Sequence, residues 1–295
     1  MPSGFLCLDK PSGITSRDAV NAIQRLVRPQ KVGHAGTLDP LATGVLAIAI
    51  GSATRLIRHV QDQPKRYRGT FELGLSSDTE DITGQITRRC DPTGVTEERL
   101  RDVLSGFVGS LEQTPPQFSA VHVQGQRAYD LARKGVAMDL APRRVEIFSM
   151  ELADFASPLF TIDVECSGGT YIRSLGRDIG ERLGCGAVMT ALRRTAVGRF
   201  ALDTAIPLDA VTRDSLPGQL MPLALAVAHL PVATLSPAQI RALRCGQTIA
   251  FDDGRLTDGA EVALFDDAGQ LAGVGIVDRE QHRLRAPLVL PQEST

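Results

Sequence analysis

The sequence is poor in aromatic residues. Its 295 residues include no tryptophan, and phenylalanine, tyrosine and tryptophan together make up 4% of the chain. Proteins that bind single-stranded RNA by stacking bases on a sheet need several exposed aromatic rings. The composition therefore argues against a stacking platform built from many rings.

Long apolar runs and paired cysteines are also missing. No run approaches the roughly 20 apolar residues of a transmembrane helix, and residues 1–10 lack the basic flank and long apolar stretch of a signal peptide. We therefore expect a cytoplasmic protein. The five cysteines are widely spread and form no Cys-x-x-Cys pair, which argues against a disulfide framework and against a zinc site.

Charge is nearly balanced overall but unevenly distributed. The formal net charge is −2, whereas residues 1–70 carry ten Lys and Arg against four Asp. Residues 173–199 carry six Arg against two acids, and residues 251–295 carry four Arg against nine acids. Clustered cations suit contacts with nucleic-acid phosphates, although ordinary solvated helix faces would give the same distribution.

The apolar pattern predicts an α+β fold. Apolar residues make up 43% of the chain, which is enough for one large domain and one small one. Strands are predicted at 5–8, 45–50, 67–73, 143–150 and 159–166, and helices after Thr15, at about 100–107 and at 172–183 before Gly184. Because strands and helices do not alternate regularly, we expect a mixed, largely antiparallel sheet flanked by helices.

The C-terminal part has a different pattern. Residues 206–231 are apolar and interrupted by prolines, as in a connection packed on a domain surface. Ser236 and Pro237 then predict the start of a helix, and alternating runs at 261–265, 271–277 and 283–290 predict a small β-barrel. We therefore expect a large domain at 1–230 and a small one at 231–295.

One glycine-rich segment, residues 31–44, offers groups for chemistry. It carries three glycines and a proline and leads into the apolar run 45–50, so we expect a loop held on a buried strand. It contains His34 and the carboxylate of Asp39, but neither a phosphate-binding P-loop motif nor a dinucleotide-binding glycine pattern. By residue chemistry alone, an aspartate before proline is more typical of a turn than of a catalyst.

Six short motifs occur in order along the chain. They are LDKPSGITS (8–16), GHAGTLDPLATG (33–44), KRY (65–67), DTEDITG (78–84), GTYIR (169–173) and LRR (192–194). Together they resemble the motifs of the TruB-type tRNA pseudouridine synthases, over about residues 4–200. The tail is similar to a small RNA-binding PUA domain. The resemblance implies an α+β domain with a mixed sheet around a central cleft.

The resemblance also implies an activity. Such enzymes isomerise the uridine at position 55 in the T-loop of tRNA to pseudouridine, without a cofactor or a metal, after the target nucleotide is flipped out. It implies a cytoplasmic monomer that binds the T-arm, aided by an insertion at 117–141. A plain solvated helix would explain that insertion almost as well.

Individual roles follow from the same resemblance. Asp39 is the expected nucleophile or base, and Arg173 the arginine that pairs with it. The other expected substrate-binding residues are Tyr67, which stacks on the target base, Tyr171 and Leu192, which line the pocket, and His34, which fills the space of the extruded nucleotide. Lys10, Pro11 and Gly36 are expected to support the Asp39 loop.

Two alternatives remain at this point. A pseudouridine synthase acting on another RNA would share the same chemistry. A tRNA-binding or folding module without catalysis would need only the basic surface.

Overall fold

The computed structural model describes residues 3–119, 122–123, 126–127 and 138–291. The main sheet contains β1 (Gly4–Lys10), β2 (Val32–His34), β3 (Thr43–Ile50), β4 (Lys65–Leu73), β7 (Gly109–Gln113), β10 (Arg143–Ala156), β11 (Leu159–Cys166), β12 (Ala187–Val197), β13 (Phe200–Ala201) and β14 (Ile206–Pro207). Its order is β14-β1-β3-β12-β4-β11-β10-β7, with β2 paired to β3 and β13 to β12. The pairs β1–β14 and β3–β12 are parallel and the others antiparallel. The predicted α+β fold with a mixed, largely antiparallel sheet is confirmed.

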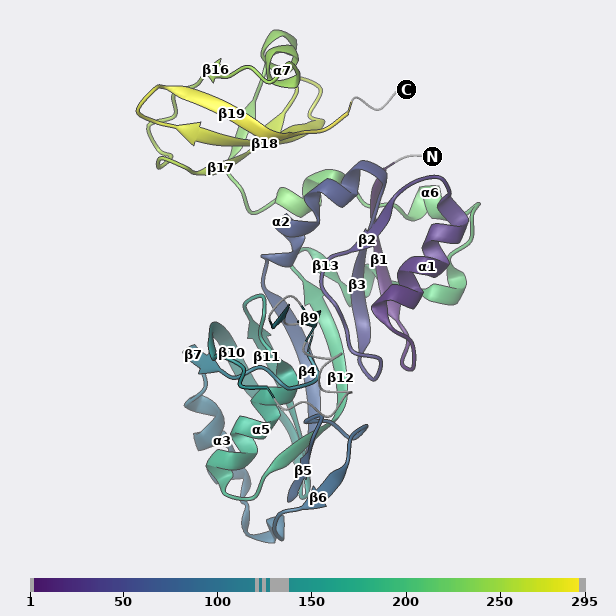
Figure 1. Ribbon diagram of the computed structural model, residues 1–295, viewed down its shortest axis with the longest axis vertical. Coiled ribbons are helices and arrows are strands. Elements are labelled where there is room, and N and C mark those ends of the chain that lie inside the picture. Colours follow the sequence, from purple (N-terminus) through teal and green to yellow (C-terminus); the bar gives the residue numbers. More distant parts are fainter. Residues whose placement is uncertain (1–2, 120–121, 124–125, 128–137, 292–295) are drawn as a thin grey trace.

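Helices cover the two halves of this sheet. They are α1 (Ser16–Val27), α2 (Ile57–Gln61), α3 (Glu97–Ser105), α5 (Ile172–Leu183) and α6 (Leu216–Gln219), with 3-10 turns η1 (Gly51–Leu56), η2 (Pro92–Gly94), η3 (Leu202–Thr204), η4 (Leu208–Ala210) and η5 (Leu223–Val227). Figure 1 shows α1 beside β1–β3, and α3 with α5 beside β4, β10 and β11. Two short hairpins, β5 (Leu75–Ser77) with β6 (Ile86–Arg88) and β8 (His122–Val123) with β9 (Gln126–Arg127), complete this part.

Local signals set the ends of the helices as predicted. Thr15 caps α1 through a capping box, in which its hydroxyl accepts from the amide of Asp18 and the Asp18 carboxylate accepts from the amide of Thr15. Gly184 ends α5 in the left-handed region, with φ +80°. The start of α1 and the end of α5 therefore lie where the sequence predicts them.

Two strands differ from the sequence prediction. Residues 32–34 were expected to lie in a loop but pair with β3, so the loop of interest shrinks to residues 35–42. Strand β12 was not predicted, because Arg193 and Arg194 interrupt its apolar pattern. It lies between β3 and β4 near the middle of the sheet, and Arg194 is buried there.

The C-terminal residues form a separate curled sheet. Its order is β15-β17-β18-β19-β16, formed by β15 (Val232–Thr234), β16 (Ile249–Ala250), β17 (Glu261–Phe265), β18 (Leu271–Asp278) and β19 (Arg283–Val289). Helix α7 (Pro237–Arg244) begins at Ser236 with a second capping box, as predicted. The three long strands match the three alternating runs, and the curled sheet fits the expected PUA-like barrel. In Figure 1 it lies at one end of the molecule, beyond α2.

The segment 206–231 is more than a surface connection. It contains η4, α6 and η5, and the side chains of Leu216 and Val227 are fully buried. Through Val227 it joins an apolar cluster that also contains Phe5 and Val274, so the segment bridges the main sheet and the C-terminal sheet. Its apolar content reflects this packing on both sides.

Most of the expected T-arm insertion, 117–141, lies outside the described residues. Within the described ranges, no helix combines the length and apolar character needed to cross a membrane.

Candidate active site

Asp39 lies on the loop 35–42, between β2 and β3. The loop is anchored to the first residue of α1: the Ser16 hydroxyl donates to the Leu38 carbonyl at 3.1 Å and accepts from the Leu38 amide at 2.8 Å. Leu38 itself is buried, whereas the side chain of Asp39 remains 36% exposed. These two hydrogen bonds fix the backbone next to Asp39, while the Asp39 carboxylate remains partly exposed.

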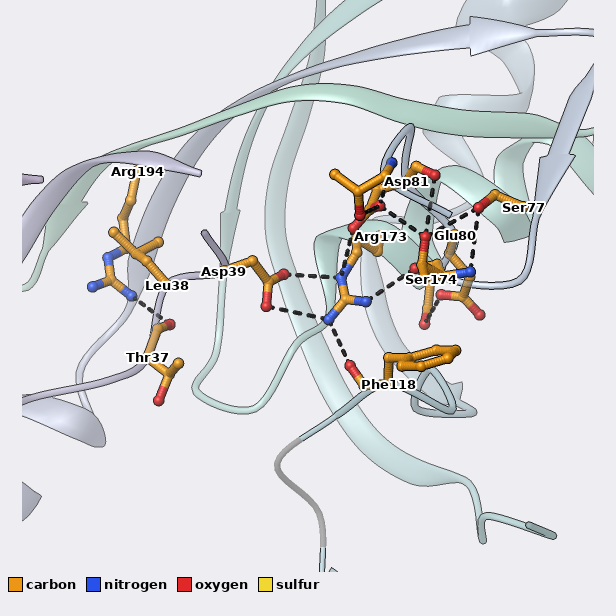
Figure 2. A network of polar contacts seen from close by, with 12 residues as sticks. Thr37, Leu38, Asp39, Ser77, Glu80, Asp81, Phe118, Arg173, Ser174 and Arg194 are labelled. Atoms are coloured by element: carbon orange, nitrogen blue, oxygen red, sulfur yellow. Dashed lines mark hydrogen bonds and ion pairs between the residues drawn. The ribbon is translucent and has the colours of Figure 1, made fainter. Parts of the chain in front are cut away.

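Arg173, in the first turn of α5, contacts this carboxylate in a fork. Its Nε lies 2.9 Å from Oδ2 of Asp39, and its Nη2 donates to Oδ1 at 3.3 Å (Figure 2). The arginine side chain is only 7% exposed. A planar guanidinium with two donors fixes both the position and the orientation of a carboxylate. The fold thus joins two residues that lie 134 positions apart in the sequence.

Other acceptors hold the Arg173 guanidinium in turn. Nη1 donates to the Thr79 carbonyl at 2.9 Å and Nη2 to the Phe118 carbonyl at 3.0 Å. Oδ2 of Asp81 lies 3.9 Å from Nε, and Asp81 Oδ1 accepts from the Thr83 amide at 2.9 Å. Sequence reasoning gave Thr79 and Asp81 no role, although both belong to the quoted motif DTEDITG.

Lys10 supports the Asp39 loop from beneath. Its side chain is fully buried, and its Nζ donates to the carbonyls of Pro11 at 2.8 Å, Ile14 at 2.9 Å and Pro40 at 3.4 Å. Burial lowers the pKa of Lys10 from 10.5 to about 8, although the charge of Asp39 acts in the opposite direction. Pro11 contributes its carbonyl, while the residue as a whole is exposed.

Arg194 supports the same loop from β12. It is 1% exposed, and it donates to the carbonyls of Val45 at 2.7 Å, Gly36 at 3.1 Å and Thr37 at 3.4 Å. Gly36 has φ +102°, a backbone conformation that favours glycine. Sequence reasoning quoted Arg194 within the motif LRR but assigned it no role. An arginine inside an otherwise apolar strand was the signal available.

Tyr67 and Leu192, here called the apolar wall, are buried side chains. They belong to the same apolar cluster as Leu38, the residue before Asp39. Residue 67 lies opposite Arg194 in the pairing of β4 with β12. Burial raises the pKa of Tyr67 above its ordinary value, more than the neighbouring Arg194 guanidinium lowers it. The phenol is therefore neutral at physiological pH.

Tyr171 stands at the N-cap of α5, two residues before Arg173. Its amide donates to Oε1 of Gln113 at 2.8 Å, and Nε2 of Gln113 donates back to its carbonyl at 3.0 Å. The guanidinium carbon of Arg143 lies 5.5 Å from the centre of the Tyr171 ring. Gln113, which sequence reasoning missed, thereby ties the start of α5 to β7.

His34 ends β2, at the edge of the Asp39 loop. It is partly buried, and burial lowers its pKa below 6.5, assisted by the charges of Arg17 and Arg194. The imidazole is therefore mainly uncharged at neutral pH. In the part of the chain that the structure describes, His, Cys, Asp and Glu side chains form no group of three that could hold a metal ion.

A basic cleft lies at the far end of β3 from the Asp39 loop. Its volume is about 1100 Å³, and it is bordered by η1 and the end of β19. Its cationic lining residues are Arg28, Lys31, Arg55 and Arg244, and among the described residues its lining includes no Asp or Glu. The chain thus carries exposed positive charge between the main sheet and the C-terminal sheet, separate from the Asp39 site.

Profiles and sequences of known proteins match nearly the whole chain. A family profile described as TruB family pseudouridylate synthase (N terminal domain) matches residues 24–172, and two C-terminal TruB profiles match residues 173–223 and 231–285. The protein named tRNA pseudouridine synthase B of Synechococcus sp. is 43% identical over 95% of both chains. Its namesake in Syntrophotalea carbinolica is 40% identical over 92% of this chain and 90% of its own.

A solved structure shares the fold over nearly the whole chain. It is an H/ACA RNP bound to a substrate RNA containing 2'-deoxyuridine, with a TM-score of 0.75 and 25% identity, and the match covers 99% of this chain and 86% of that one. Since a family profile spans half of the chain and relatives at 40% identity or more span nearly all of it, the chain belongs to the TruB family of pseudouridylate synthases.

Proposed function

We propose that this chain converts the uridine at position 55 in the T-loop of tRNA to pseudouridine, with Asp39 as the essential nucleophile or base. As a TruB family member the chain is an isomerase that forms pseudouridine, and the tRNA relatives support tRNA as its substrate. One observation supports the role of Asp39: the buried Arg173 contacts both oxygens of its partly exposed carboxylate.

The chemistry needs few groups. The bond between N1 of uracil and C1' of ribose breaks, the base turns, a bond forms between C5 and C1', and the C5 proton moves to solvent while N1 gains one. No electrons are gained or lost. Asp39 serves as the carboxylate beside base and sugar, and the apolar wall of Tyr67 and Leu192 keeps water from capturing the detached base. Arg173 keeps the carboxylate oriented during both bond changes.

The target base must leave its stack before it can reach Asp39. An enzyme acting on a base inside folded RNA extrudes that nucleotide, and something must fill the gap. His34 suits that role, because its lowered pKa leaves a neutral ring that can stack between bases without a charge to desolvate. Tyr67 is proposed to stack on the flipped base, and Tyr171 to line the pocket.

We further propose that residues 1–230 form the catalytic domain and residues 231–295 a PUA-like RNA-binding domain. The enzyme would act as a cytoplasmic monomer on the T-arm, without metal or cofactor. The cationic cleft supports phosphate contacts outside the Asp39 site.

A second candidate substrate is an RNA other than tRNA. The H/ACA RNP whose fold this chain shares is bound to a substrate RNA. Its identity to this chain, 25%, is lower than the 43% and 40% of the two tRNA pseudouridine synthases. We therefore place tRNA first.

Incubation of the purified chain with unmodified tRNA, followed by mapping of pseudouridine, tests the proposal. We expect modification at position 55 and at no other uridine. Asp39→Asn should abolish it while tRNA binding persists, because binding depends on phosphate contacts elsewhere. Asp154→Asn, the same change at an exposed residue of β10, is the control and should remain active. An active Asp39→Asn variant would refute the assigned role.

A further inference from the structure

Glu80 has an unusual backbone and a buried carboxylate. It lies in the middle of the motif at 78–84, where its φ of +63° is in the left-handed region that non-glycine residues seldom adopt. The residue is only 9% exposed. Such a conformation persists where surrounding contacts over-determine it, and it is often found near functional sites.

Helix α5 supplies the contacts of the Glu80 side chain. The Ser174 hydroxyl donates to Oε2 of Glu80 at 2.7 Å, and Nη1 of Arg177 forms an ion pair with Oε1. Arg177 also pairs with Asp178, where Nη2 lies 2.7 Å from Oδ1. Both carboxylate oxygens of Glu80 are therefore held by the helix that carries Arg173.

The residues on either side of Glu80 contact Arg173. Thr79, directly before Glu80, accepts from Arg173 through its carbonyl, and Asp81, directly after it, lies 3.9 Å from the same guanidinium. Figure 2 shows Glu80 and Ser174 beside this group. On the other side, the Glu80 carbonyl accepts from the Met189 amide at 3.1 Å, which ties the loop to β12.

Residues four apart on a helix lie on one face, so Arg173 and Arg177 approach the loop together. Arg173 donates to the backbone carbonyl of Thr79, and Arg177 forms an ion pair with the side chain of Glu80. The loop is thereby attached to α5 at two points one helical turn apart. Without the Glu80 carboxylate, the loop would keep the contact of Thr79 with Arg173 and that of the Glu80 carbonyl with Met189. It would lose both contacts of the Glu80 side chain with α5.

We propose that Glu80 is a positioning residue for the Asp39–Arg173 pair, acting through its contacts with Ser174 and Arg177. This rests on the proposed function of Asp39. Removal of the Glu80 carboxylate would release the loop from the second turn of α5 and loosen the guanidinium of Arg173. Asp39 would then lose its fixed orientation without losing any contact with RNA.

The Glu80 carboxylate is buried, although apolar side chains would attach the loop to α5 at a lower cost in free energy. Burial raises the pKa of Glu80, and Arg177 and Ser174 partly offset this effect. Buried ion pairs add little stability over apolar packing, but they can select one arrangement of the chain. Asp39 requires a single arrangement of this kind, because its carboxylate must stay aligned during two successive bond changes.

The test compares four variants by kcat, KM and melting temperature on unmodified tRNA. Glu80→Ala should lower kcat by about tenfold with KM within about twofold, because orientation is lost and RNA contacts are not. Glu80→Gln, which can still accept from Ser174, should lose about threefold, and Ser174→Ala should lose less. Glu98→Gln, at an exposed position of α3, is the control and should match the unaltered enzyme.

A double-mutant cycle completes the experiment. Arg177→Gln combined with Glu80→Gln should be no slower than the worse single variant, since both act through one contact. Unchanged kcat in folded Glu80→Gln, or a fall in melting temperature without any fall in kcat, overturns the proposal. Ser174→Ala removes a single hydrogen bond and keeps the test open if Glu80→Ala does not fold. Failure of the proposed function would be seen separately: in an unaltered enzyme that does not modify position 55, or, for the role of Asp39, in an active Asp39→Asn variant.

Discussion

At the scale of single residues, the active site depends on buried cations. Lys10, Arg173 and Arg194 are each less than a tenth exposed, and each donates to backbone carbonyls near Asp39. Buried cations are costly unless several acceptors surround them. Lys10 and Arg194 therefore hold the backbone of the Asp39 loop at some cost in stability, while Arg173 holds the Asp39 carboxylate.

Arg173→Lys tests the need for the fork. Lysine keeps the charge but cannot donate from two fixed nitrogens, so Asp39 should lose its orientation. We expect kcat to fall by about 100-fold with a nearly unchanged KM. Single-turnover rates on tRNA measure the chemical step directly. Arg182→Lys, on the last turn of the same helix, is the control, and equal losses in the two variants would contradict the prediction.

Lys10 makes stability depend on pH in a defined direction. Its pKa is about 8 in the folded chain and 10.5 ordinarily, so between these values the unfolded chain binds more protons. The free energy of unfolding should therefore rise with pH across this window, and Lys10→Met should remove that part of the rise. Urea unfolding at the two ends of the window measures it. Lys65, also buried with a pKa of about 8, remains in both chains and cancels from the difference. An identical rise in both chains would exclude the effect.

At the scale of elements, helix α5 sets the geometry of the site. Its end at Gly184 was readable from the sequence, whereas its distance from the sheet depends on Gly176. A Cβ at this position would lie 2.3 Å from the ring of Phe71 in β4. Glycine therefore allows the close approach that brings Arg173 to Asp39.

Gly176→Ala should push α5 away from β4. We expect a loss of about 1–3 kcal/mol in the free energy of unfolding, as for other overpacked cores, together with a fall in kcat. Chemical unfolding and steady-state kinetics provide the two measurements. Gly218→Ala, in α6, is the matched control because a Cβ there meets nothing within 4 Å. A variant with wild-type stability would show that the helix has room to spare.

Strands show where element prediction succeeded and failed. β1, β4 and β11 were predicted because one face of each is apolar or the whole run is. β12 was missed because Arg194 occupies a position that alternation reserves for an apolar residue. That arginine is buried only because the tertiary structure supplies the carbonyls of Gly36, Thr37 and Val45 around it.

At the scale of the whole molecule, the C-terminal sheet shares a core with the main sheet. One buried cluster includes Phe5, Val197 and Val227 together with Ala263, Val274 and Leu290. In addition, Arg55 of η1 donates to the carbonyl of Val289 at 2.5 Å. The two sheets are thus joined by apolar packing as well as by a polar contact.

Truncation of the chain at residue 231 should therefore destabilise what remains. Removing Val274 and Leu290 uncovers apolar surface, and each buried side chain of this size contributes about 1.5–3 kcal/mol. We expect the melting temperature to fall by about 5–10 °C. Calorimetry of the truncated and full chains checks this. Arg55→Gln, which removes only the polar contact, should change it much less. An unaltered melting temperature would mean that packing of the C-terminal sheet does not stabilise the rest of the chain.

The sequence by itself determined the local features: the caps of α1, α5 and α7, the α+β class, the apolar strands and the loop that carries Asp39. Each of these depends on residues within one or two turns or strands of one another. Local patterns did not show which charges meet. The pairing of Asp39 with Arg173 was expected only from the family resemblance, and the tertiary structure alone decided the pairing of Glu80 with Arg177. Arg173 reaches Asp39 across 134 residues, and Glu80 reaches Arg177 across 97, because helix packing and sheet order bring these segments together. Local periodicity carries no information about such distant pairs.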